Sequence, residues 1–85
     1  MNIEDIRSDL ERLRERALTA FAAAPALLTL EELEVAILGK KGDLTVILRG
    51  IGSLPVDDRP RVGAIANEIR AAIETALAER RGTLG

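Results

Sequence analysis

Cysteine and histidine are both missing from this sequence of 85 residues. Their absence excludes Cys/His zinc sites, thiol nucleophiles, and both Ser-His-Asp and Cys-His catalysis. The lack of cysteine also fits a reducing compartment. Aromatic residues are almost absent, since Phe21 is the single one although 47% of the residues are hydrophobic. The core must therefore be aliphatic, and such residues at helical spacing form a seam rather than a deep interior with a pocket.

Long apolar runs are missing too. No stretch approaches the roughly 18 uninterrupted apolar residues of a transmembrane helix. The chain starts with Asn2, Glu4 and Asp5 among its first residues, unlike the basic start of a signal peptide. It contains no internal repeat, no low-complexity tract and no strand pattern. We therefore expect one small helical domain over residues 1–85, in a soluble cytoplasmic protein without a membrane contact.

Charge is distributed unevenly along the chain, whose net charge is −2. Residues 1–38 carry four arginines against eight acidic residues, or −4, while residues 62–85 carry three of each sign. Residues 39–61 carry five basic residues against three acidic ones, or +2. A general nucleic-acid-binding protein would be basic along its length, so this pattern favours an RNA contact confined to one region.

The first helix is expected over about residues 3–24. Apolar or small residues recur alternately three and four positions apart, which is a heptad seam. The seam comprises Ile3, Ile6, Leu10, Leu13, Ala17, Ala20 and Ala24. Acidic residues alternate with arginines elsewhere on this helix, which indicates a solvated face rather than an RNA-binding stripe. Those arginines are Arg7, Arg12, Arg14 and Arg16.

Pro25 ends this helix, because proline disfavours helical geometry in the residue before it. A capping box and a hydrophobic staple mark the next helix start. The box comprises Thr29 as N-cap with Glu32, and the staple comprises Leu28 and Leu33. The sequence therefore predicts a second helix over about residues 30–38 that stops at Gly39.

A short helix and a long helix complete the chain. Apolar residues three and four apart predict the short one over about residues 43–49. The long one is expected over about residues 58–81, with Asp57 or Asp58 as its cap and Pro60 in its first turn. Its seam comprises Val62, Ile65, Ile69, Ala72 or Ile73, Ala76 and Leu77. Residues 82–85 are expected to be a frayed end, or the point where a larger chain was cut.

The two long helices set the predicted architecture. Each has about 22 residues and spans roughly 33 Å. Because their lengths match and a compact middle joins them, we expect them to pack antiparallel. The predicted fold class is all-α: a long antiparallel helical hairpin, or coiled-coil arm, with two short helices packed at one end.

The run Gly39-Lys40-Lys41-Gly42 is the most informative local feature. Glycine adopts positive φ without steric cost, so the two glycines predict a sharp corner at a helix end. The two lysines are then held at a tip where their ammonium groups stay exposed, a suitable place to hold a phosphate. The run is not a Walker A loop, and its likeness to a KH-domain GxxG loop is in composition only.

Further motifs follow the corner in a recognisable order. The run from Leu38 to Thr45 is followed by Leu54-Pro55, then by Arg59-Pro60-Arg61-Val62-Gly63, then by Asn67-Glu68. From about Leu30 to Arg81, this order resembles the N-terminal domain of the bacterial phenylalanyl-tRNA synthetase alpha chain.

The resemblance implies a helical arm, an antiparallel coiled coil that reaches out to tRNA, followed by a class II catalytic domain in the full-length subunit. The implied parent is a cytoplasmic phenylalanine–tRNA ligase that uses ATP and Mg²⁺, with its catalytic residues beyond Gly85. This chain itself is expected to hold no catalytic residue, cofactor or metal. The implied partners are tRNA, the catalytic domain and the beta subunit. An excised domain and a stand-alone paralogue both remain open.

The resemblance also implies RNA-binding positions. Those that match its motifs are Lys40, Lys41, Arg59 and Arg61. Arg49 is added from its neighbourhood, and Arg70 because it lies on the exposed side of the last helix. Their role would be electrostatic contact with phosphates and 2′-hydroxyls, which positions RNA without reading its sequence. Phe21 is read as a core residue, so base stacking is not expected.

Two other classes of function are weighed against this one. The carboxylates lack the cleft that would shift the pKa values of an acid/base pair apart, so the chain alone is not expected to be an enzyme. The alternative is a non-catalytic helical hairpin that dimerises through the alanine-rich seam of the first helix. An isolated two-helix seam leaves an apolar stripe partly exposed, which favours self-association.

Overall fold

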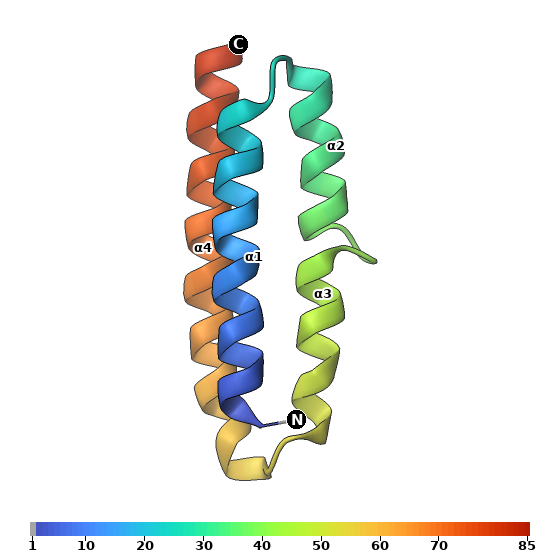
Figure 1. The fold of residues 1–85 in the computed structure, drawn as a ribbon, viewed down its shortest axis with the longest axis vertical. Coiled ribbons are helices and arrows are strands. Elements are labelled where there is room, and N and C mark those ends of the chain that lie inside the picture. The colour runs from blue at the N-terminus through green and yellow to red at the C-terminus, as the bar shows by residue number, and fades with distance from the viewer. Residues whose placement is uncertain (1) are drawn as a thin grey trace.

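The computed structural model describes residues 2–85, which form an all-α bundle without a strand (Figure 1). The predicted fold class is therefore confirmed. The elements are α1 (Ile3–Ala23), α2 (Leu27–Leu38), α3 (Asp43–Leu48), the 3₁₀ turns η1 (Arg49–Ser53) and η2 (Val56–Asp58), and α4 (Arg59–Leu84).

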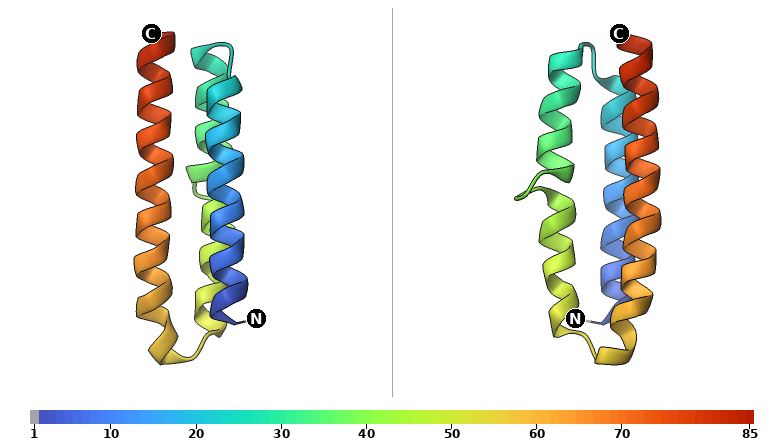
Figure 2. Two further views of the ribbon diagram at one scale, coloured as in Figure 1. Left: turned by 60° about the vertical axis from the view of Figure 1, so that its left-hand side comes forward. Right: turned by 180° about the vertical axis from the view of Figure 1, so that it is seen from behind.

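The two long helices, α1 and α4, pack side by side in the same direction (Figures 1 and 2). α2 and α3 stack end to end and run back alongside this pair, so the molecule is an up-down-up rod of 43 × 19 × 15 Å. A hydrogen bond of 2.7 Å from Arg80 Nη2 to the Ala24 carbonyl joins the C-terminal ends of α1 and α4. The predicted antiparallel hairpin with two short helices at one end is therefore wrong in its arrangement.

The length of the connecting segment explains this difference. α1 has 21 residues, while α2 and α3 together have 18 and are extended by the five residues of η1. At about 1.5 Å per residue, both stretches span roughly 30–35 Å. The short helices thus carry the chain back along the whole of α1, and α4 must start where α1 starts.

α1 matches its predicted range to one residue. A capping box holds its start, since Asn2 Oδ1 accepts from the Asp5 N–H at 3.0 Å and Asp5 Oδ2 accepts from the Asn2 N–H at 3.2 Å. Its end lies at Ala24, which is extended in front of Pro25, as the sequence predicts. The seam is buried along Ile6, Leu10, Leu13, Ala17, Phe21 and Ala24.

α2 begins at Leu27, earlier than the sequence predicts. Ala26 occupies the N-cap position without a side-chain hydrogen bond, so Thr29 is not a cap. Leu28 is 67% exposed, which rules out the staple. The helix starts early because the Leu30 N–H bonds the Ala26 carbonyl at 3.1 Å, and this turn carries Leu30 into the core. Core packing outweighs local capping preference here.

The junction between α2 and α3 is a tight loop closed by backbone contacts. Gly39 (φ −68°, ψ 174°) and Gly42 (φ −74°, ψ 170°) are extended, so the predicted positive φ is wrong. Glycine is required here by close approach instead. A Cβ atom would lie 2.4 Å from the Val35 carbonyl oxygen at Gly39, and 2.7 Å from the Ile37 carbonyl oxygen at Gly42. The Thr45 hydroxyl donates to the Gly39 carbonyl at 3.1 Å and holds the loop closed.

α4 extends to Leu84, three residues beyond its predicted end, so residues 82–84 are helical rather than frayed. Asp58 precedes the helix but makes no side-chain cap bond, because the η2 turn already leads into it. Pro60 lies in the first turn as predicted. The buried seam is Val62, Ala66, Ile69, Ile73 and Leu77, while Ile65 and Ala76 are only half-buried.

One aliphatic core runs the length of the bundle. Its buried members come from α1, α2, α3, α4 and Leu54, and among residues 2–85 none of the buried residues is polar or charged. Phe21 is 1% exposed, which confirms its prediction as a core residue. The functional surface must therefore lie outside the core, in the loop and on the exposed helix faces.

Candidate nucleic-acid interface

Lys40 and Lys41 lie at the tip of the α2–α3 loop, which projects sideways from the middle of the bundle (Figure 1). Both side chains are exposed, and within residues 2–85 neither ammonium group takes part in an ion pair. The closed backbone beneath them restricts the loop. Two exposed cations thus stand on a restricted loop, and lysine side chains are among the groups that contact phosphates in nucleic-acid complexes.

Arg49, Arg59 and Arg61 gather at the end of the bundle where η1, η2 and the start of α4 meet. All three are exposed. Arg59 also has a structural role, because its Nε donates to the Leu54 carbonyl at 3.3 Å and its Nη2 to the Gly52 carbonyl at 3.1 Å. From the start of α3 to the end of η1 the chain rises roughly 17–20 Å. This group is therefore separate from the α2–α3 loop of residues 39–42, which we call the lysine loop.

Arg70 is exposed and lies about three turns along α4 from Arg59, or roughly 16 Å. It shares a side of α4 with Arg81, eleven residues later, which bonds Glu34 of α2 at 3.0 Å. The six predicted basic residues thus fall into three groups: the loop, the η1–η2 end, and the middle of α4. The structure does not bring them together in one patch.

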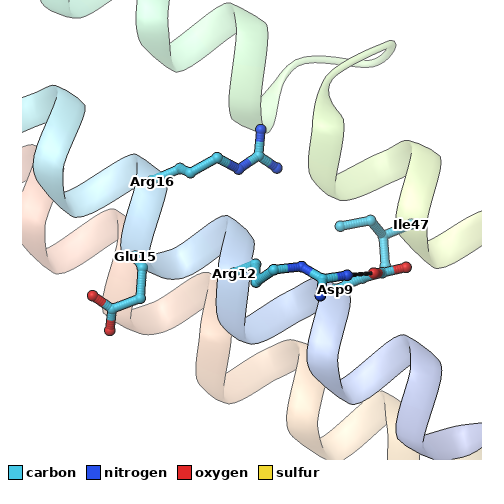
Figure 3. Close-up of a pocket in the computed structure, with 5 residues that line it drawn as sticks. All are labelled: Asp9, Arg12, Glu15, Arg16 and Ile47. Atoms are coloured by element: carbon cyan, nitrogen blue, oxygen red, sulfur yellow. Dashed lines mark hydrogen bonds and ion pairs between the residues drawn. The ribbon is translucent and has the colours of Figure 1, made fainter.

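A groove between α1 and α3 contains arginines that the sequence analysis assigned to a solvated face (Figure 3). It has a volume of about 470 Å³ and is lined by Asp9, Arg12, Glu15, Arg16 and Ile47. Arg16 Nη1 lies 3.9 Å from Asp43 Oδ2, so this guanidinium reaches the start of α3 just beyond the lysine loop. The i, i+4 spacing of Arg12 and Arg16 places them on one side of α1, but only the fold shows that α3 faces them.

Acidic residues limit what this groove can bind. Arg12 pairs with Asp9, and Arg16 with Asp43. Such exposed pairs add little stability, but they offset much of the positive charge that an anion would meet. The lysine loop therefore remains the most accessible positive feature near α3.

Residues 2–85 contain no group of three or more His, Cys, Asp or Glu side chains placed to hold a metal ion. Among the helices of the same range, none is both long and apolar enough to cross a bilayer.

A family profile described as "Aminoacyl tRNA synthetase class II, N-terminal domain" matches residues 25–85. The match covers well over half of the chain and includes α2, the lysine loop, α3 and α4. The chain belongs to this family. The family of class II aminoacyl-tRNA synthetase N-terminal domains is the one that the ordered motifs from Leu30 to Arg81 predict, so that prediction is confirmed.

Individual proteins similar to this chain support the same family assignment. The chain is 51% identical over 75 residues to the phenylalanine–tRNA ligase alpha subunit of Moorella thermoacetica, with 88% of the chain and 22% of the relative covered. It is 46% identical over 79 residues to the subunit of the same name from Natranaerobius thermophilus, with 93% and 23% covered. The chain thus spans less than a quarter of the length of the relatives it matches. No solved structure matches it significantly.

Proposed function

We propose that this chain is the tRNA-binding arm of a phenylalanine–tRNA ligase alpha subunit and positions tRNA for aminoacylation. The observation that carries the proposal is the lysine loop, in which Lys40 and Lys41 project from the bundle on a backbone that tolerates only glycine on either side. The proposed contact residues are Lys40, Lys41, Arg49, Arg59, Arg61 and Arg70.

The proposed contact is electrostatic. Lysine and arginine side chains on an exposed surface bind phosphates and 2′-hydroxyls, which orients RNA without reading bases. Phe21, the one aromatic residue of the sequence, is 1% exposed, so its ring is buried and cannot stack on a base. The arm would add affinity and orientation, and other parts of the enzyme would read tRNA identity.

The remaining proposals concern the whole enzyme. Residues 1–85 would form one helical domain, and the class II catalytic domain would occupy the part of the relatives that this chain does not match. Aminoacylation, with its ATP and Mg²⁺, would take place there and not on this chain. The proposed partners are tRNA, that catalytic domain and the beta subunit, in the cytoplasm.

Dimerisation through the alanine-rich seam of α1 is not supported as an alternative. The seam residues Leu10, Leu13 and Ala17 are at most 1% exposed, because they belong to the core of the bundle. These three side chains are therefore not free to contact a second hairpin.

A salt series with phenylalanine tRNA tests the proposed function. For the Lys40→Gln/Lys41→Gln variant, we expect weaker binding and a salt dependence whose logarithmic slope falls by about 1.4–1.8, since each phosphate contact adds about 0.7–0.9. Arg7→Gln/Arg14→Gln makes the same charge change on α1 and serves as control. Equal losses in both variants would show that only net charge matters and would remove the loop from the RNA surface.

A further inference from the structure

Large apolar side chains are exposed mainly on one side of the bundle. Among residues 2–85 four of the five exposed ones belong to α2 and α3, while the outer faces of α1 and α4 contribute none. These four are Leu27 (40%), Leu28 (67%), Val35 (68%) and Val46 (57%), and the fifth is Val56 (70%) in η2.

Three of these side chains, Leu28, Val35 and Val46, lie on the face of α2 and α3 that points away from the core. Leu28 and Val35 are seven residues apart, two helical turns, and lie opposite the buried Leu30 and Ile37. On α3, Val46 lies opposite the buried Leu44 in the same way. Because α2 and α3 stack end to end (Figure 2), Leu28 and Val35 on α2 are followed along the rod by Val46 on α3. We call this surface the outer α2–α3 face.

Charge on the outer α2–α3 face has a definite order. The exposed Glu31 and Glu32 precede Val35, and the exposed Lys40 and Lys41 follow it at nearly equal separation along the chain. An antiparallel copy, related by a twofold axis near Val35, would place acids against lysines at both ends of the contact and valine against valine at its centre. A twofold interface needs this kind of self-complementary surface.

We propose that the outer α2–α3 face is a docking surface for a second copy of this chain, packed antiparallel about Val35. This inference goes beyond the proposed function. The rod measures 43 × 19 × 15 Å, so a long face offers at most roughly 650–800 Å² per copy. Two copies would thus bury at most roughly 1,300–1,600 Å² in total, which lies within the range of specific interfaces. The dimer would cover the lysine loop, so it would compete with any anion bound there.

Sedimentation velocity of the chain without RNA, from about 10 μM to 1 mM at low salt, tests this proposal. We expect the sedimentation coefficient to rise with concentration, and Val35→Asp to abolish the rise. Val56→Asp introduces the same charge at an equally exposed valine outside the face and should leave the rise unchanged. A monomer throughout the range, or equal effects of the two substitutions, would overturn the proposal. Circular dichroism of each variant checks that the bundle stays folded.

A charge-exchange experiment tests the antiparallel arrangement. Lys40→Glu/Lys41→Glu makes these four positions all acidic, and Glu31→Lys/Glu32→Lys makes them all basic. Each variant alone should remain monomeric, because like charges meet at both ends, whereas an equimolar mixture should associate more strongly than the original chain. A mixture that sediments as the average of its separate components would overturn the antiparallel arrangement. Neither result depends on whether the chain binds tRNA.

Discussion

At the scale of single residues, the lysine loop depends on the two glycines that enclose it. Neither has positive φ, so their backbone conformation alone is open to any residue. What excludes a side chain is the backbone of α2, whose carbonyl oxygens lie 2.4 Å and 2.7 Å from the missing Cβ positions of Gly39 and Gly42. The loop backbone is therefore fixed by packing, and it carries Lys40 and Lys41 at an exposed position.

Gly39→Ala is expected to lower the free energy of unfolding by about 1–3 kcal/mol, because the Val35 carbonyl group must move. Gly63→Ala is the matched control. Gly63 lies within α4 with no atom within 4 Å of its added Cβ, so alanine should stabilise the helix there by about 0.5–1 kcal/mol. Urea unfolding of both variants checks this pair, and a neutral Gly39→Ala would contradict the packing argument.

The sequence predicts these residues unevenly. It locates Gly39, Gly42 and the exposed lysines, since helix ends and glycines are local signals. It does not predict that Gly39 and Gly42 lie close to the backbone of α2, because this depends on the path that the chain takes after the last residue of α2. Nor does it reveal that Arg16 meets Asp43, since 27 positions separate them and only the fold brings α1 and α3 together.

At the scale of the elements, the starts of α1 and α2 show two different causes. Local capping marks the start of α1, whereas core packing decides the start of α2. α1 has a capping box at Asn2 and Asp5, whereas α2 starts without any side-chain cap. The box predicted at Thr29 fits the sequence pattern as well as any, yet the helix begins three residues earlier than predicted. Capping energies of about 1 kcal/mol are smaller than the gain from burying a leucine, so the placement of Leu30 in the core decides the start of α2.

Alanine substitution tests these two positions directly. Asn2→Ala is expected to lower the free energy of unfolding by about 0.5–2 kcal/mol, because it removes the acceptor of the Asp5 N–H. Thr29→Ala should change it by less than about 0.5 kcal/mol, since Thr29 caps nothing. Thermal and urea unfolding give both values. A larger loss at Thr29 than at Asn2 would contradict the observed start of α2.

At the scale of the whole molecule, the observed bundle differs from the predicted hairpin in the relative direction of α1 and α4, which is parallel and not antiparallel. Heptad seams identify α1 and α4 as packed helices, but the same spacing of apolar residues fits a parallel and an antiparallel neighbour. The direction follows from the length of α2, α3 and η1, which return the chain along the entire rod. That the two short helices stack into one rod depends on the shape of the loop between them, which periodicity does not describe.

Spin-label distances test the parallel arrangement, and the lack of cysteine allows clean labelling at introduced cysteines. Ser8→Cys/Arg61→Cys places both labels near one end, so their separation should stay close to the 19 Å width of the rod. Ser8→Cys/Glu79→Cys separates the labels along the axis by most of the roughly 27 Å that the 18-residue step from position 61 to position 79 spans on α4. The reverse order of the two distances would indicate an antiparallel hairpin.

The central claim is that the lysine loop contacts tRNA, and an NMR titration of the chain with phenylalanine tRNA tests it most directly. The 85-residue chain is small enough for its amide signals to be followed individually. We expect the largest shifts and broadening at residues 39–42, smaller changes near Arg49 and Arg61, and little change on the outer face of α1. Changes confined to α1, or none at the loop under conditions where tRNA binds, would contradict the claim.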